Sequence, residues 1–251
     1  MSDRNAGSSK LGRVVAVIPA GGTGMRMGAD VPKQFLPLGG VPMVLHSLRA
    51  FDRAPSVDAV ILVVPREERQ RALTDVIERY SVKKVQKVVA GGETRQQSVH
   101  NGLKETGPDV EIVVVHDAVR PFVTEDLIEQ SIEAARKGGA VIVAVPMKDT
   151  PKLAGPDRQV QRTLDRDDLW LAQTPQTFRR DLLLEAYEKA AIERLQATDD
   201  AALVERLGHK VGIVAGTWEN IKITSPEDLV IAEAILAARA KDVKRHTLNG
   251  L

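Results

Sequence analysis

Glycines and two basic side chains are concentrated near the start of the sequence. The apolar run 14–19 leads into Ala20-Gly21-Gly22-Thr23-Gly24, and Arg26 and Lys33 follow shortly after it. Glycines let backbone N–H groups approach a ligand closely, and a loop of such groups binds anions. Because two cations beside this loop suit a triphosphate, the segment predicts a nucleotide-binding loop at the end of a buried strand.

The spacing of these glycines differs from two common phosphate-binding motifs. A P-loop requires G-x-x-x-x-G-K-[ST], but Met27 stands at the second glycine position counted from Gly22, and Ala29 at that position counted from Gly24. A dinucleotide fingerprint requires G-x-G-x-x-G, and Met27 again occupies its last position. The alternative is a plain strand-to-turn connection, and the nearby Pro32-Lys33-Gln34 favours the nucleotide loop instead.

A carboxylate follows the apolar run 112–115. The segment His116-Asp117-Ala118-Val119-Arg120-Pro121 places Asp117 just beyond this predicted strand, at the edge of a parallel sheet that would also carry the glycine loop. Mg²⁺ takes one or two carboxylates together with substrate phosphates. Asp117 is therefore a candidate ligand of a metal or of a nucleotide, and the alternative is a turn aspartate paired with Arg120.

Three other segments carry candidate residues. Gly91-Gly92-Glu93-Thr94-Arg95-Gln96-Gln97-Ser98 opens a predicted helix, whose first N–H groups favour an anion or the edge of a base; a glycine turn before a capped helix is the alternative. Lys222 follows the last predicted strand and would point to the same edge of the sheet. Arg166 lies in a charged segment, and for both basic residues a solvated surface side chain is the alternative.

Composition excludes several classes of function. The chain has no Cys and a net charge of +1, which excludes thiol chemistry and gives no general case for nucleic-acid binding. Its apolar runs are shorter than the ~20 residues of a membrane span, and no signal peptide is recognisable, so we expect a cytoplasmic protein. Without a nucleophile elbow or an HExxH motif, catalysis by positioning and electrostatics remains.

Short β-branched runs alternate with amphipathic segments along the chain. Runs without polar alternation are typical of strands buried on both faces, and alternating strands and helices predict an open, doubly wound, mostly parallel α/β sheet. The expected strands are 14–19, 59–64, 84–90, 112–116, 140–146 and 211–214, and the expected helices are 43–51, 67–80, 94–105, 125–137, 180–196, 199–207 and 226–239.

One segment interrupts this alternation. Residues 147–173 contain Pro151, Gly155 and Pro156 before a charged, strand-like run, and loops longer than ~12–15 residues are usually functional or disordered. We interpret it as a protruding β-arm, inserted into a single domain over 13–240, that contacts a second copy of the chain. Residues 1–12 and 241–251 are predicted to be flexible tails.

With these segments considered together, the chain from about residue 13 to 238 resembles the 2-C-methyl-D-erythritol 4-phosphate cytidylyltransferases of the non-mevalonate isoprenoid pathway. The glycine loop with Pro32-Lys33-Gln34 is similar to that of many nucleotidyltransferases of Rossmann-like fold, and the segments at 91–99 and 116–121 narrow the resemblance to cytidylyltransferases. The most discriminating stretch is Thr163-Leu164-Asp165-Arg166-Asp167-Asp168-Leu169-Trp170 with Gln173-Thr174-Pro175-Gln176. Leu164 and Gly21 depart from the family pattern conservatively.

The resemblance implies that CTP and 2-C-methyl-D-erythritol 4-phosphate react to give the cytidine diphosphate ester and pyrophosphate. It also implies Mg²⁺ as cofactor and a homodimer with interlocked arms. The alternatives are a cytidylyltransferase for another polyol phosphate such as ribitol 5-phosphate, a sugar-1-phosphate nucleotidyltransferase, and a nucleotide-binding protein without activity.

Residue roles follow from the resemblance at matching positions. Arg26 and Lys33 would stabilise charge on the nucleotide phosphates, and Arg166 and Lys222 would hold the acceptor phosphate. The residues implied to bind the nucleotide are Pro19, Ala20, Gly21, Gly22, Gly24, Gly91, Ser98, Asp117 and Ala118. Asp117 would also bind the metal. The residues implied to bind the acceptor are Thr150, Arg166, Thr174, Thr198 and Lys222.

Overall fold

A seven-stranded sheet forms the centre of the computed structural model, which describes residues 12–21 and 31–248, with side chains up to Lys241. Its strands are β1 (Arg13–Pro19), β4 (Ala59–Val64), β5 (Val85–Ala90), β6 (Val110–Val115), β7 (Ala140–Pro146), β10 (Trp170–Arg179) and β11 (Gly212–Ala215). They are arranged in the order β11-β7-β10-β6-β1-β4-β5. All pairings are parallel except those of β10 with β6 and β7, which confirms the predicted doubly wound, mostly parallel sheet.

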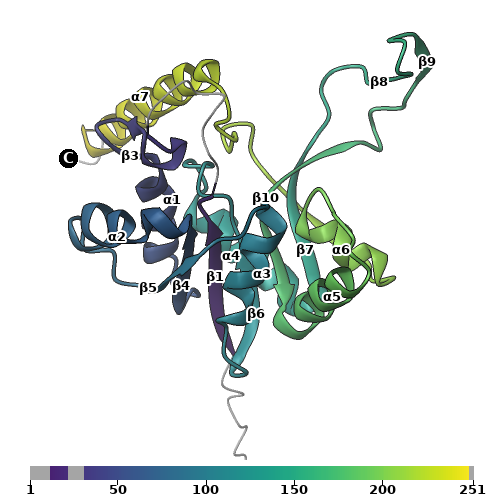
Figure 1. Cartoon of the computed structure of the whole chain (residues 1–251). Coiled ribbons are helices and arrows are strands. Elements are labelled where there is room, and N and C mark those ends of the chain that lie inside the picture. Colours follow the sequence, from purple (N-terminus) through teal and green to yellow (C-terminus); the bar gives the residue numbers. More distant parts are fainter. Residues whose placement is uncertain (1–11, 22–30, 249–251) are drawn as a thin grey trace, which may run out of the picture.

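Helices cover both faces of the sheet (Figure 1). The helical segments are η2 (Lys33–Phe35), α1 (Met43–Arg53), η3 (Arg66–Glu68), α2 (Arg69–Arg71), η4 (Ala72–Glu78), α3 (Arg95–Lys104), α4 (Glu125–Gly138), α5 (Arg180–Ile192), α6 (Asp200–Arg206) and α7 (Pro226–Leu248). The predicted helix 67–80 is instead three successive segments, because the chain changes from 3₁₀ to α to π geometry. The short strands β2 (Pro37–Leu38) and β3 (Val41–Pro42) form a separate hairpin.

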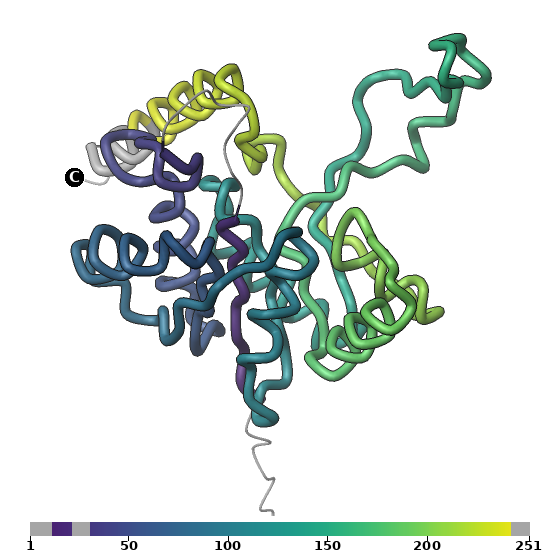
Figure 2. Tube along the Cα trace, in the orientation of Figure 1, coloured from purple at the N-terminus to yellow at the C-terminus, as the bar shows by residue number. Residues whose placement is uncertain are grey.

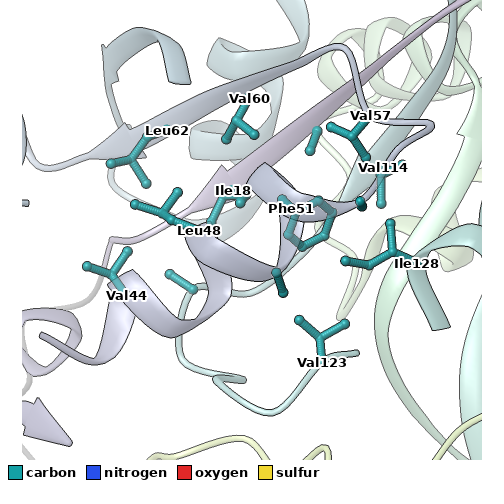
Figure 3. Close-up of a cluster of buried hydrophobic side chains, with 14 of the residues drawn as sticks. Ile18, Val44, Leu48, Phe51, Val57, Val60, Leu62, Val114, Val123 and Ile128 are labelled. Carbon is teal, nitrogen blue, oxygen red and sulfur yellow. The ribbon is translucent and has the colours of Figure 1, made fainter. Parts of the chain in front are cut away.

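Alternate residues of the buried strands enter two different cores, because successive side chains of a strand point to opposite faces. Ile18 of β1 packs with Leu48 and Phe51 of α1 on one face (Figure 3). Val15 and Val17 of β1 pack on the other face, in the core formed with α3, α5 and α6. Burial on both faces explains why β1 and β4 consist almost entirely of β-branched and aliphatic residues.

The predicted β-arm is present as a hairpin of β8 (Lys152–Ala154) and β9 (Val160–Thr163), which projects far from the body of the molecule (Figure 2). All residues of both strands are exposed. The chain leaves the sheet at the end of β7 and returns at the start of β10, where Trp170 is paired with Pro146. The arm therefore ends before residue 173, the predicted boundary.

Two other predictions from the sequence were wrong. The expected strands did not include residues 170–179, where β10 lies inside the sheet, between β6 and β7. We also expected a tail from residue 241, but α7 continues to Leu248, because no glycine or proline follows Pro226 within the helix. None of the helices within the described part of the chain has the length and apolar character needed to cross a membrane.

Candidate active site

The carboxyl ends of β1, β4, β5 and β6 meet at the edge of the sheet where ligands of doubly wound folds bind. The chain runs from β1 to β4 and β5 on one side and then returns to β6 on the other side of β1, so β1 and β6 flank the switch point. Three backbone hydrogen bonds join the loops beyond these strands: from Ala20 N to Val63 O (2.7 Å), Ala118 N to Pro19 O (3.2 Å) and Gly91 N to Val64 O (2.8 Å).

A cavity of about 920 Å³ opens at this edge. The predicted site residues that line it are Pro19, Ala20, Gly21, Lys33, Gly91, Ser98, Asp117 and Lys222. Ala118, which we also predicted, is fully buried and does not line this cavity. The predictions for Gly22, Gly24 and Arg26 lie outside the described residues.

A second, smaller cavity of about 240 Å³ adjoins the first. Thr174, Thr198 and Lys222, three of the residues predicted to bind the acceptor, line it. The two cavities share Arg95, Asp117 and Lys222 in their linings. These three side chains therefore stand at the boundary between the two spaces.

The structure does not bring the other two predicted acceptor residues to these cavities. Thr150 is exposed in the arm, and Arg166 lines neither cavity. The guanidinium of Arg166 donates to the backbone oxygen of Lys148 (3.1 Å), and its side chain is 56% exposed. Both residues lie on the projecting part of the chain.

Asp117 is the electrostatic centre of the site. Its Oδ1 accepts a hydrogen bond from Arg95 Nε (2.8 Å), its Oδ2 lies 2.8 Å from Lys222 Nζ, and its side chain is only 8% exposed. Burial alone would raise the pKa of Asp117, but the charges of Arg95 and Lys222 outweigh it and hold this pKa well below its usual range. Asp117 is therefore an anion in the folded protein at neutral pH.

The loop that carries Lys222 is fixed by buried polar contacts. Asn220 donates to Gln173 Oε1 (3.0 Å) and to the backbone oxygen of Thr174 (2.8 Å). Arg120, which we had considered as a partner of Asp117, instead donates to the backbone oxygen of Asn220 (2.7 Å). Since these contacts anchor the neighbouring backbone, the base of the Lys222 side chain has a defined position.

Close backbone approach explains the glycine at position 91. A Cβ atom there would lie 2.9 Å from the hydroxyl oxygen of Ser98, so a larger residue would displace that side chain. The Ser98 hydroxyl accepts from Gly92 N (3.1 Å) and donates to Thr94 O (2.9 Å). Thr94 in turn caps α3 by accepting from Gln97 N. The predicted glycine turn is thus also a capped helix start that faces the larger cavity.

Sequence reasoning gave no role to two residues of the site that lie within the motifs it named. Arg95 was part of a noted motif, but its partner Asp200 lies 105 positions away, and no local signal connects them. Gln34 lines the larger cavity and is 1% exposed, yet neither polar atom of its amide has a hydrogen-bond partner within the described residues. Buried amides are normally paired, and this exception could be found only from the structure.

The donor set agrees with a metal ion carried mainly by substrate phosphates. Among the described residues no group of three or more His, Cys, Asp or Glu side chains could hold a metal ion. Asp117 lines both cavities, and each of its oxygens has a second lone pair beside the one that Arg95 or Lys222 engages. One carboxylate together with phosphate oxygens is a common environment of Mg²⁺.

Fold and site together define a Rossmann-like α/β protein whose cavity is suited to a phosphorylated nucleotide. The family model described as IspD, 2-C-methyl-D-erythritol 4-phosphate cytidylyltransferase, matches residues 14–238. The chain therefore belongs to the 2-C-methyl-D-erythritol 4-phosphate cytidylyltransferase family, and the family and enzyme class predicted from the sequence are confirmed.

Individual relatives agree with this assignment. The chain is 51% identical over 230 residues to the 2-C-methyl-D-erythritol 4-phosphate cytidylyltransferase of Pelotomaculum thermopropionicum, covering 91% of this chain and 96% of the relative. It also resembles the crystal structure of 4-diphosphocytidyl-2C-methyl-D-erythritol synthase from Anaerococcus prevotii, with a TM-score of 0.80, 36% identity, and coverage of 90% and 96%. The crystal structure of the cytidylyltransferase from Thermus thermophilus matches with a TM-score of 0.73, 35% identity, and coverage of 89% and 98%.

Proposed function

We propose that the larger cavity binds CTP and the smaller one binds 2-C-methyl-D-erythritol 4-phosphate, in the cytidylyl transfer that defines the family. The single observation that carries this arrangement is the shared boundary of Arg95, Asp117 and Lys222. Two substrates placed on either side of this cluster would bring their phosphates together beside the Lys222 ammonium group.

The transfer needs no protein nucleophile. A phosphate oxygen of the acceptor attacks the α-phosphorus of CTP and forms the new P–O bond. The bond from the α-phosphorus to the bridging oxygen breaks, and pyrophosphate leaves with that electron pair. Because the attacking group is already an anion, no strong base is required, and the main task is to bring anions together and stabilise the charge that develops.

The residues at the cavities suit this task. Lys222 would neutralise the acceptor phosphate, and Lys33, which lines only the larger cavity, would stabilise the nucleotide phosphates together with Arg26. Gly91 and Ser98 would contact the cytidine, because they lie where α3 begins at the wall of that cavity. Thr174 and Thr198 would orient the acceptor polyol from the smaller cavity.

Asp117 would hold Mg²⁺ together with the nucleotide phosphates. The bound ion would neutralise charge on the triphosphate. Exchanging Asp117 for Asn should raise the Mg²⁺ concentration that gives half-maximal rate, because a neutral amide is a weaker ligand for a hard cation. A Mg²⁺ titration that matches that of the unaltered enzyme would contradict this role and favour a purely structural aspartate.

The exposed arm supports a homodimer in which Arg166 serves the site of the other chain. Arg166 lies on the projecting hairpin and lines neither cavity of its own chain. A β-arm that is exposed on all sides has little to bury against in a single chain.

A cytoplasmic location is the simplest setting for this enzyme, since a chain without cysteine suits a reducing compartment.

Pyrophosphate release tests the proposed site. The enzyme should turn over CTP with 2-C-methyl-D-erythritol 4-phosphate, and should prefer this pair to CTP with ribitol 5-phosphate and to UTP. Lys222→Ala should lower kcat by about 10²–10³-fold, as the loss of one preorganised charge-stabilising group does. Lys210→Ala removes an exposed lysine elsewhere and is the matched control. Equal turnover of both lysine variants would refute the role of Lys222.

A further inference from the structure

A chain of polar contacts runs from the boundary between the two cavities into the protein interior. Lys222 Nζ lies 2.8 Å from Asp117 Oδ2, and Asp117 Oδ1 accepts from Arg95 Nε (2.8 Å). Arg95 Nη2 donates to Asp200 Oδ2 (2.9 Å), and the hydroxyl of Tyr187 donates to Asp200 Oδ1. This series of contacts thus alternates cations and carboxylates and ends at the buried phenol of Tyr187.

The outer end of this series of contacts is Lys222, whose side chain is flexible. A lysine carries its charge on a single ammonium group at the end of a flexible four-carbon side chain, and the side chain of Lys222 is 39% exposed. Within the described residues, Lys222 forms its ion pair with Asp117. The position of the ammonium group between the cavities therefore depends on how firmly Asp117 is held.

Arg95 holds Asp117, although its position is unfavourable for the helix that carries it. Arg95 is the first residue of α3, and a cation at a helix N-terminus opposes the helix dipole. Burial alone would lower the pKa of Arg95, but Asp200 and Asp117 outweigh it and raise this pKa further above its usual value. The two carboxylates, and not the helix, account for a charged side chain at this place.

The inner end of the chain is rigid. Asp200 is fully buried, and an unpaired carboxylate in such a place would be strongly destabilising. The hydroxyl of the buried Tyr187 fixes one of its oxygens and Arg95 fixes the other. The side chain of Gln176 accepts from the backbone N–H groups of Asp200 and Ala201 (3.1 Å each), which anchors the start of α6.

We propose that Arg95 is a positioning residue for cytidylyl transfer. Tyr187 and Asp200 fix its guanidinium group, this group fixes the carboxylate of Asp117, and the carboxylate places the Lys222 ammonium between the two substrates. The planar fork of an arginine holds two donor nitrogens at a fixed separation, and here one bonds Asp117 and the other bonds Asp200; a lysine has a single nitrogen and cannot reproduce this geometry. This proposal rests on the role given to Lys222 above.

The proposal predicts which variants lose activity while the fold is retained. Arg95→Lys keeps the charge but replaces the two donor nitrogens by one, so it cannot keep both contacts in their present geometry, and it should lower kcat about 10- to 100-fold, as misplacement of a reacting group by about 1 Å does. Tyr187→Phe removes only the inner hydroxyl and should lower kcat by about tenfold or less by the same effect. Tyr80→Phe changes the other tyrosine of the chain and should leave kcat unchanged.

A double-mutant cycle separates positioning from general weakening of the fold. If Tyr187 acts through Lys222, its effect on kcat should shrink to less than about twofold in a Lys222→Ala background, because coupled residues are not additive. An effect that is undiminished in this background would overturn the proposal. Unfolding in urea is measured for every variant as a control for loss of the fold. If kcat of Tyr187→Phe returns to normal at a lower temperature, where the variant is fully folded, the loss came from unfolding and the proposal would be overturned.

The cycle also distinguishes failure of this proposal from failure of the proposed function. Lys222→Ala with unaltered turnover would reject the role of Lys222 itself. Impaired turnover of Lys222→Ala, combined with an equal Tyr187→Phe effect in both backgrounds, would reject only the chain of contacts. If Arg95→Lys and Tyr187→Phe each lower kcat, and this loss vanishes in the Lys222→Ala background, the result supports both the role of Lys222 and the positioning role of Arg95.

Discussion

Gln34 offers a test in which stability and ligand binding should change in opposite directions. Its side chain is 1% exposed, and both polar atoms of its amide are without partners in the part of the chain that the structure describes. Leaving a buried polar group unpaired costs about 1–3 kcal/mol. Gln34→Met keeps the length of the side chain and removes the unpaired amide, so the protein without nucleotide should gain about 1–3 kcal/mol of unfolding free energy.

The same substitution should weaken CTP binding. Gln34 lines the larger cavity next to Lys33, and a bound nucleotide is rich in groups that could pair with its amide. If such a hydrogen bond contributes about 0.5–1.5 kcal/mol, the Kd for CTP should rise about 2- to 12-fold. Urea unfolding without nucleotide measures the first effect, and titration calorimetry with CTP measures the second.

Gln176→Met is the matched control for the stability measurement. Gln176 is also buried, at 2% exposure, but its amide donates to Asp199 (2.9 Å) and accepts from two backbone N–H groups of α6. The same exchange should therefore destabilise the protein by about 1–3 kcal/mol. If Gln34→Met is destabilising like the control, or if it leaves CTP binding unchanged, the argument from the unpaired amide is refuted.

Three further predictions concern pH, the nucleotide loop and the arm. Burial lowers the pKa of His116 from 6.5 to about 4, so between these pH values the unfolded chain binds a proton at this side chain and the folded chain does not. The free energy of unfolding should therefore fall by roughly 3 kcal/mol as the pH drops through this window. His116→Gln should flatten this pH dependence in urea unfolding, and an unchanged pH dependence would contradict the role of His116. Lys33→Ala should lower kcat by about 10²–10³-fold in the pyrophosphate assay, and near-normal turnover would remove Lys33 from the mechanism. Mixing inactive Arg166→Ala chains with inactive Lys33→Ala chains should restore activity, because one site of each mixed dimer would be intact; no recovery despite confirmed subunit exchange would contradict action across the dimer.

The parts of the fold that were predictable are those where local sequence and burial agree. The runs 59–64 and 140–146 match β4 and β7 residue for residue, because strands buried on both faces carry only apolar side chains. β10 was missed for the converse reason. Its middle contains Gln173, Thr174, Pro175 and Gln176, and its pairing with β7 shifts register there, so neither periodicity nor propensity marks it as a central strand.

The site was predictable where a residue lies directly beyond a recognisable strand. Asp117 and Gly91 follow β6 and β5 at the same edge, and the topology places both at the cavity. Arg95 and Asp200 could not be paired in this way, because each looks like an ordinary residue in the first turn of a helix. Only the packing of α3 against α5 and α6 brings their side chains together.

The two ends of the arm have a consequence for how the chain could be altered. Because Pro146 and Trp170 are partners across adjacent strands, the segment between them enters and leaves the body at a single place, as the loop of a hairpin does. Such a segment is modular. Replacing it by a short turn would leave every strand of the sheet and both cavities connected as they are now, so the catalytic body and the arm could be exchanged between relatives as separate building blocks.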